Sequence, residues 1–245
     1  MADDDEIEYV CCLPGCGGYT TLSKLSVCSR CKSVSARYCS EACKEKDWVE
    51  HKQVCKSAEE QEKHIKINEL LIIAAERGQL KGISTLIMER GANVNYFGRD
   101  GLTALMVAAQ NEDDVAVAHL LRLGADVNVI STDQYRSTAL ALASQNGNTA
   151  VVQVLLAAGA NVNYFGSMDG GSAVLLACQN NHPSTVRLLI KAGADINRPN
   201  TLDSSAPLTI ASFRGNVEVV EILIEAGADV NYVRKDSATA LILAR

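Results

Sequence analysis

The sequence lacks long apolar runs, a basic leader and an excess of positive charge. Its apolar segments are far shorter than the ~20 residues that a membrane-spanning helix requires. The N-terminus is acidic (Asp3-Asp4-Asp5-Glu6), whereas a secretory signal begins with basic residues and turns apolar. The sequence therefore predicts an intracellular protein, cytoplasmic or nuclear, in a reducing compartment where cysteines hold metal more often than they form disulfides.

The chain has an odd number of cysteines and few aromatic residues. Nine cysteines cannot all pair, so a pure disulfide framework is disfavoured. Aromatic residues make up only 4% of the chain, so the places where they gather are informative. Hydrophobic residues nevertheless reach 47%, and 245 residues suffice for one large domain or two ordinary ones.

Thiol and imidazole side chains are concentrated between residues 11 and 55. Zinc prefers these two ligand types, and a site with four protein ligands leaves no open position for chemistry. Eight ligands suffice for two such structural sites, so we expect two zinc ions per chain. The candidate ligands are Cys11 or Cys12, Cys16, Cys28, Cys31, Cys39, Cys43, His51 and Cys55.

The spacing of these ligands agrees with a zinc module. Cys28 and Cys31 form a C-x2-C turn, and Cys39 and Cys43 form a C-x3-C turn. A helix over about 41–55 would keep the last ligands close together. Such a short segment has little apolar core, so each metal ion would supply on the order of 10–16 kcal/mol of folding free energy.

The segment resembles a MYND-type zinc finger. The resemblance rests on Cys28-x2-Cys31, Arg37-Tyr38-Cys39-Ser40-x2-Cys43 and Asp47-Trp48-x2-His51-Lys52-x2-Cys55. It implies a cross-braced pair of zinc sites. Cys11 or Cys12, Cys16, Cys39 and Cys43 would hold one ion, and Cys28, Cys31, His51 and Cys55 would hold the other.

The resemblance also implies binding of short proline-containing peptides. Trp48 matches a residue that lines the peptide surface in such fingers, although it could equally serve only the small core of the finger. Lys44 stands where relatives have a Gln, which places that contact in doubt. The first ligand stays open between Cys11 and Cys12, with Cys11 favoured because Pro14-Gly15 lengthens the turn.

From residue 67 the chain repeats with a period of 33–35 residues. Gly-Ala-(Asn/Asp)-(Val/Ile)-Asn begins at Gly91, Gly124, Gly159, Gly193 and Gly227, and an apolar pair precedes each Gly by four residues. Thr-Ala-Leu-x-x-Ala begins at Thr103, Thr138 and Thr239. Thr or Ser would cap a first helix, a small Ala would allow close helix packing, and Gly would end a second helix.

This pattern resembles the ankyrin repeat, in which two antiparallel helices and a hairpin loop form each unit. The predicted fold is therefore mostly α, an ankyrin-repeat solenoid behind an N-terminal cross-brace zinc finger. The sixth repeat stops at Arg245, so either a half-repeat caps the stack or the chain is truncated. The expected divisions are an acidic tail (1–10), the finger (11–55), a helical linker (56–66), five repeats (67–99, 100–133, 134–168, 169–202, 203–236) and a partial repeat (237–245).

Aromatic residues gather at the expected hairpin tips, which hold four of the seven Tyr and two of the three Phe. Tyr and Arg are enriched among the residues that dominate binding at protein interfaces. The tips could therefore form a partner-binding ledge, or their rings could simply pack on neighbouring hairpins. The six residues are Tyr96, Phe97, Tyr135, Tyr164, Phe165 and Tyr232.

These features favour a non-enzymatic adaptor that is expected to be monomeric. A peptide would bind the finger, and a folded protein or longer segment would bind the repeats. One alternative is a lysine methyltransferase, because MYND fingers also occur with SET domains, but none fits around this finger. The other alternative is nucleic-acid binding. It is disfavoured because the chain has a net charge of −6 and the finger with two bound zinc ions has a net charge near zero.

The two-zinc assignment leads to a direct prediction. Elemental analysis of the purified chain should give two zinc ions per molecule, and His51→Ala/Cys55→Ser should reduce this to about one, because both changes affect a single ion. His64→Ala, which removes a histidine without a partner at metal spacing, should leave the zinc content unchanged. Equal zinc contents in the double variant and the wild type would refute the ligand assignment.

Overall fold

Helices dominate the part of the chain that the structure describes. This computed structural model describes residues 8–10, 19–21, 26–27, 37–38, 58–166 and 171–244, with side chains from residue 63 onward. The chain divides into two units, Met1–Lys66 and Ile67–Arg245. None of the helices in the described ranges is long and apolar enough to cross a membrane.

The first unit contains two short antiparallel strand pairs. Strand β1 (Glu8–Val10) pairs with β2 (Tyr19–Thr21), and β3 (Ser26–Val27) pairs with β4 (Arg37–Tyr38). The registers place Val10 opposite Tyr19 and Val27 opposite Arg37. Each pair therefore brings together the two ends of a cysteine-containing segment.

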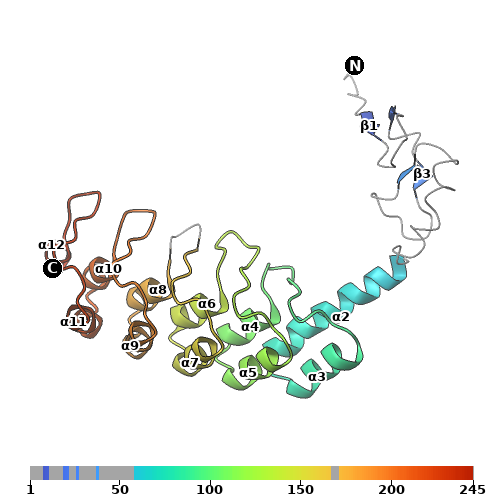
Figure 1. Cartoon of the computed structure of the whole chain (residues 1–245), viewed down its shortest axis with the longest axis horizontal. Helices are drawn as coiled ribbons and strands as arrows, with labels where there is room; N and C mark the ends of the chain where they lie inside the picture. Colours follow the sequence, from blue (N-terminus) through green and yellow to red (C-terminus); the bar gives the residue numbers. More distant parts are fainter. Residues whose placement is uncertain are drawn as a thin grey trace. The chain divides into compact units, whose positions relative to one another are not determined.

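The second unit is a stack of antiparallel helix pairs. First helices α4, α6, α8 and α10 form one row, second helices α5, α7, α9 and α11 form the other, and the hairpin loops project from the first-helix side (Figure 1). The helices are α2 (Ala58–Glu76), α3 (Leu80–Ser84), the π-helical η3 (Thr85–Glu89), α4 (Ala104–Gln110), α5 (Asp114–Arg122), α6 (Ala139–Asn146), α7 (Thr149–Ala157), α8 (Ala173–Gln179), α9 (Pro183–Lys191), α10 (Pro207–Arg214), α11 (Val217–Glu225) and α12 (Ala240–Leu243).

The predicted caps begin the first helices. The hydroxyl oxygens of Thr103, Thr138 and Ser172 each accept a hydrogen bond from the backbone N–H three residues later, at 3.3–3.4 Å. Each bond satisfies one of the free N–H groups at a helix start. Pro207 occupies the first turn of α10, where its missing N–H costs nothing. The capping prediction is thus confirmed for α4, α6 and α8, whereas the Thr239 side chain at the start of α12 makes no such hydrogen bond.

Residues in the left-handed backbone conformation, with positive φ, follow the helix ends, as predicted for the glycines. The five Gly residues of the Gly-Ala markers have φ between +70° and +91°. The turns between paired helices use Gly78, Gly147 and Gly215 in the same way, whereas Glu112 and Asn181 adopt φ of 61° and 60° there. An L side chain disfavours this conformation, so Glu112 introduces local strain.

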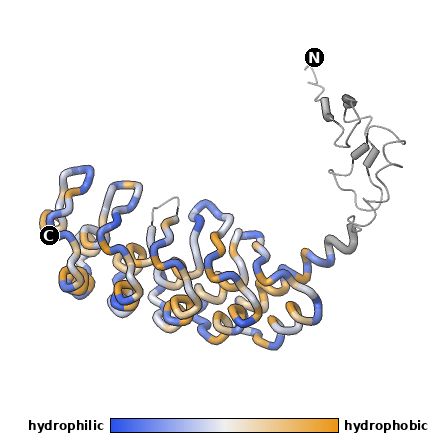
Figure 2. The backbone as a smooth tube through the Cα atoms, viewed as in Figure 1, coloured by the Kyte–Doolittle hydropathy of each residue, from blue (hydrophilic) through white to orange (hydrophobic). Residues whose placement is uncertain are grey.

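Alanine lets the first helices approach one another closely. Ala74, Ala108, Ala143, Ala177 and Ala211 are all buried, at 0–4% exposure. Large apolar residues fill the space between the two helix rows, and Figure 2 shows polar hairpins beside these more apolar helices. The second helices contribute the fully buried Leu120, Leu155, Leu189 and Leu223 to this core.

Side-chain amides tie each hairpin to the next. Asn95 Oδ1 accepts a hydrogen bond from the Asp126 backbone N–H at 2.9 Å, and three other hairpin Asn residues repeat this contact at 2.8–2.9 Å. Asn68 of α2 makes the equivalent bond to the first hairpin, at the Asn93 N–H. At the first-helix ends, Asn146 Nδ2 donates to the Gln110 carbonyl and a His182 ring nitrogen bonds the Gln145 carbonyl. These bonds satisfy carbonyls that a helix end leaves free.

The first repeat departs from the expected register. The sequence pattern placed the apolar pair at Ile87-Met88, but the structure buries Leu86 and leaves Met88 73% exposed. The π-helical turn η3 contains one more residue per turn than an α-helix, so the buried position shifts by one. The Ala92 N–H accordingly bonds the Leu86 carbonyl, six residues earlier, where other repeats use the fifth.

The last described helix, α12, presents residues that other repeats bury. Leu241 is 84% exposed and Ile242 is 53% exposed, although Leu105 and Met106 at the same positions of α4 are buried. Helices α5 and α6 pack against α4.

The strained turn at Glu112 can be tested by substitution. Glu112→Gly should raise the free energy of unfolding of the repeats by about 1 kcal/mol, because glycine adopts positive φ without steric cost. Glu221→Gly, within helix α11, should lower it by a similar amount, about 1 kcal/mol. Urea unfolding followed by far-UV circular dichroism measures both, and a destabilising Glu112→Gly would contradict the strain assignment.

Candidate functional site

A groove of about 1080 Å³ runs over four repeats of the stack. Residues of the first helices α4, α6, α8 and α10 line its floor, and residues of the hairpins line its side. This volume is at the upper end of small-ligand pockets, and the groove spans several helices, so it suits an extended or bulky partner.

The floor of the groove is apolar because of its position in the repeat. Leu142, Leu176 and Ile210 each precede a buried alanine by one residue and line the groove. At one end, Phe213 and Leu202 add large apolar surface and are 63% and 59% exposed. Exposed apolar clusters in a concave surface are typical of sites that bind another molecule.

An ion-pair cluster forms the end of the groove near Leu202. Arg234 Nη2 lies 2.8 Å from Asp203 Oδ2 and 3.3 Å from Asp236 Oδ2. Ser205 donates to both oxygens of Asp203, through Oγ at 2.9 Å and through its backbone N–H at 3.0 Å. Burial raises the pKa of Asp203, but the hydrogen bonds of Ser205 and Asn200 and the charge of Arg234 outweigh it, so the net pKa is lowered.

The remaining carboxylate of the groove, that of Asp133, forms hydrogen bonds within its own hairpin. Asp133 Oδ1 accepts hydrogen bonds from Ser131 Oγ at 2.6 Å and from the backbone N–H groups of Tyr135 and Arg136 at 3.1 and 3.0 Å. This network fixes the hairpin backbone beside Tyr135, whose side chain stays 48% exposed in the groove.

The six hairpin-tip aromatics have different environments. Tyr135 and Tyr164 line the groove, whereas the other four tip aromatics do not. The Tyr164 hydroxyl donates to the Arg136 carbonyl at 2.9 Å, and the Tyr96 hydroxyl donates to Glu69 Oε1 at 3.3 Å. Burial and the Glu69 carboxylate raise the pKa of Tyr96.

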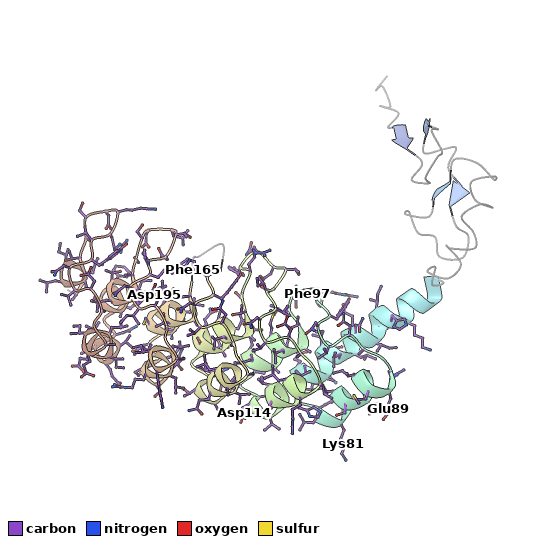
Figure 3. The ribbon with its side chains drawn as sticks, in the orientation of Figure 1. Lys81, Glu89, Phe97, Asp114, Phe165 and Asp195 are labelled. Atoms are coloured by element: carbon purple, nitrogen blue, oxygen red, sulfur yellow. The ribbon has the colours of Figure 1, made fainter. Side chains whose placement is uncertain are left out.

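The four tip aromatics outside the groove are partly covered. The Arg198 guanidinium lies over the Phe165 ring, 4.2 Å from its centroid, and Figure 3 shows both Phe97 and Phe165 at the hairpins. Phe97 and Tyr232 are half-buried. The rings therefore pack to differing extents on the stack, and only part of the expected ledge faces the groove.

Sequence reasoning missed the apolar floor of the groove. Leu142, Leu176, Ile210 and Phe213 sit at fixed distances from the buried alanines, so the repeat period contained the necessary signal. The groove-lining positions could have been found by asking which residues next to each buried alanine still contact the surface once the repeats are stacked. Cys178, beside the buried Ala177, is a buried free cysteine, and burial raises the pKa of its thiol.

The predicted metal ligands and Trp48 lie outside the described residues. Cys11, Cys12 and Cys16 belong to the segment that links β1 and β2, and Cys28 and Cys31 belong to the segment that links β3 and β4. Across the described ranges, no group of three or more His, Cys, Asp or Glu could hold a metal ion. The donor set of thiols and one imidazole matches the ligand preference of zinc.

Comparison with known families identifies both units. The family model for ankyrin repeats matches in overlapping windows, at residues 42–131, 71–166, 117–200 and 174–245. The chain therefore belongs to the ankyrin repeat family. The model for the MYND finger matches residues 12–55, so this ankyrin-repeat chain also carries an N-terminal MYND finger. No curated protein matched the chain.

These two families define a general role. The MYND finger is a zinc-binding domain, and MYND fingers and ankyrin repeats both mediate protein–protein interactions. The chain is thus a zinc-binding protein-interaction adaptor in general terms, built from domains that are typical of non-enzymatic proteins.

The lowered pKa of Asp203 makes its contribution to stability dependent on pH. That contribution is complete above the unfolded-state pKa of about 3.9 and is lost as the pH falls through the lower folded-state pKa. Asp203→Asn should therefore reduce stability at pH 7 and should show a smaller further loss than the wild type between pH 5 and pH 3.

The matched control is Asp100→Asn, at an exposed hairpin position. Thermal unfolding followed by far-UV circular dichroism at each pH measures the difference between variants, and acid loss of zinc affects all of them alike. A parallel pH dependence in Asp203→Asn and the wild type would contradict the assigned role.

Proposed function

We propose that this protein is a two-site adaptor. Its zinc finger recruits a short proline-containing peptide of one partner, and its groove holds a second protein. The observation that carries the second half is the exposed apolar surface of Phe213, Leu202 and Tyr135 within one groove. Large aromatic side chains in concave, partly desolvated surfaces are the usual anchors of protein interfaces.

The proposal for the finger is built on its ligand set. Two zinc ions would be held in a cross-brace by Cys11 or Cys12, Cys16, Cys28, Cys31, Cys39, Cys43, His51 and Cys55. Fully ligated zinc offers no open coordination position, so the metal would maintain the folded finger and take part in no reaction. Trp48 would then contribute an apolar face for the peptide.

The chain is proposed to work as an intracellular monomer. Its cysteines, arranged as metal ligands and odd in number, are the observation that supports a reducing compartment. We assign no catalytic residue, because the groove carboxylates Asp133, Asp203 and Asp236 all bond neighbouring groups of the hairpins.

Affinity capture with quantitative mass spectrometry tests the two sites separately. The captured amount of groove partners should fall at least tenfold with Tyr135→Ala/Phe213→Ala, since truncating a hot-spot side chain costs about 2 kcal/mol or more. Partners of the finger should disappear with His51→Ala/Cys55→Ser. Both losses should be selective, so that each variant retains the partners of the other site.

The control variant is Met88→Ala/Val115→Ala, which removes two exposed apolar side chains outside the groove. It should retain all partners. The groove assignment fails if Tyr135→Ala/Phe213→Ala captures the same proteins in the same amounts as this control.

A further inference from the structure

Three glutamines occupy one position on successive first helices, and all three line the groove. Gln110, Gln145 and Gln179 each follow a buried alanine by two residues. In the described part of the chain, none of their side-chain amides has a hydrogen-bond partner. Each amide offers two donors and one acceptor, so this glutamine row presents unused hydrogen-bonding groups along the groove.

The glutamine row lies beside the apolar floor of Leu142, Leu176 and Ile210. Each apolar residue precedes the buried alanine of its helix, and each glutamine follows that alanine. The next position of the glutamine row, on α10, is the exposed Phe213. The groove therefore offers apolar contacts and polar contacts side by side, once per repeat.

The general spacing of packed helices favours one conformation of a ligand that contacts successive repeats. Packed helices lie 8–10 Å apart. A polyproline-II chain rises about 3.1 Å per residue with three residues per turn, so every third side chain returns to the same face after ~9.3 Å. In a β-strand, successive side chains point to opposite faces, so every third side chain does not return to the same face.

Hydrogen bonding favours the same conformation over a helix. A polyproline-II segment has no internal hydrogen bonds, and its carbonyls are free to accept from the glutamine amides. An α-helical ligand has already paired its backbone groups and would leave the glutamine row unsatisfied.

Although the charged residues that line the groove sum to −1, one end of it carries a positive charge that an acidic group of the ligand could pair with. Five charged residues line it, and four of them have internal partners: Asp133, Asp203, Asp236 and Arg234. The guanidinium of Arg214, exposed beside Phe213, has no hydrogen bond or ion pair with any residue that the structure describes. A carboxylate of the ligand would match this single unpaired positive charge.

We propose that the groove binds a polyproline-II segment of a partner protein, with apolar side chains at every third position and an acidic residue at the Arg214 end. The apolar side chains rest on Leu142, Leu176 and Ile210. The ligand carbonyls accept hydrogen bonds from Gln110, Gln145 and Gln179. This assignment rests on the proposed partner-binding function of the groove and specifies the chemistry of that partner.

Selection of random 12-residue peptides displayed on phage, with the intact zinc-loaded chain as bait, tests this ligand class. Enriched peptides should carry apolar residues at i, i+3 and i+6 and an acidic residue near one end. Fluorescence anisotropy with the synthetic form of an enriched peptide should show about tenfold weaker binding to Gln145→Ala/Gln179→Ala. Gln153→Ala, an exposed glutamine of α7 outside the groove, should bind like the wild type.

The acidic residue is tested by a second pair of variants. Arg214→Glu should weaken binding of the acidic peptide at least fivefold. When the acidic residue of the peptide is replaced by its amide, Arg214→Glu and the wild type should bind the peptide equally well. Arg122→Glu, an exposed arginine of α5 outside the groove, should have no effect on the acidic peptide.

Three results would overturn the ligand assignment. These are the absence of enriched peptides, apolar residues spaced at i and i+4 as in a helix, and equal binding to the glutamine variant and the wild type. If cellular partners still depend on Tyr135 and Phe213 in these cases, the groove keeps its proposed function and only the polyproline-II ligand is wrong. If neither peptide binding depends on the glutamines nor capture of cellular partners depends on Tyr135 and Phe213, the proposed function itself is refuted.

Discussion

The close packing of one first helix on the next is the constraint on which this structure depends. It requires a small residue at one position of every repeat, and alanine supplies it at residues 74, 108, 143, 177 and 211. A larger side chain there would separate the helices and open voids in the core on both sides. The hairpin bonds between successive repeats, such as that from the Asp126 N–H to Asn95 Oδ1, require the same close spacing.

The groove is a consequence of this packing. On α6, α8 and α10, the residues one position before and two positions after the buried alanine line the groove. The hairpins, held by Asp133 and by the Asp203–Arg234 pair, form the side of the same groove. The surface that could bind a partner and the core that stabilises the stack are therefore produced by a single repeating arrangement.

The two units differ in how they gain stability. The repeats bury a continuous apolar core, so neighbouring units stabilise one another. The segment of the finger is short and cysteine-rich, and the first unit contains only small strand pairs among its described residues. Metal coordination is the physical source of folding free energy for domains of this composition. The two units therefore gain their folding free energy from different physical sources.

Much of the second unit could be predicted from local sequence alone. Threonine and serine caps, the glycines of the Gly-Ala markers and Pro207 act within a few residues of their own position, so their effects need no knowledge of the fold. The same holds for the chemistry of the cysteine cluster, because the preference of zinc for thiolate and imidazole depends only on the donor atoms. The spacing of the markers predicted the repeat, and the family model for ankyrin repeats confirmed it.

Tertiary structure decided what local sequence could not. The π-helical turn of the first repeat moved burial from Ile87 to Leu86, because a single extra residue in a turn changes which side chain faces the core. Packing between residues about 34 positions apart placed Tyr135 and Tyr164 in the groove and left Phe165 beneath Arg198. The sequence by itself determined the helices, their ends and the zinc chemistry. The accessible surface depended on contacts between repeats, and such contacts exist only after the stack has formed.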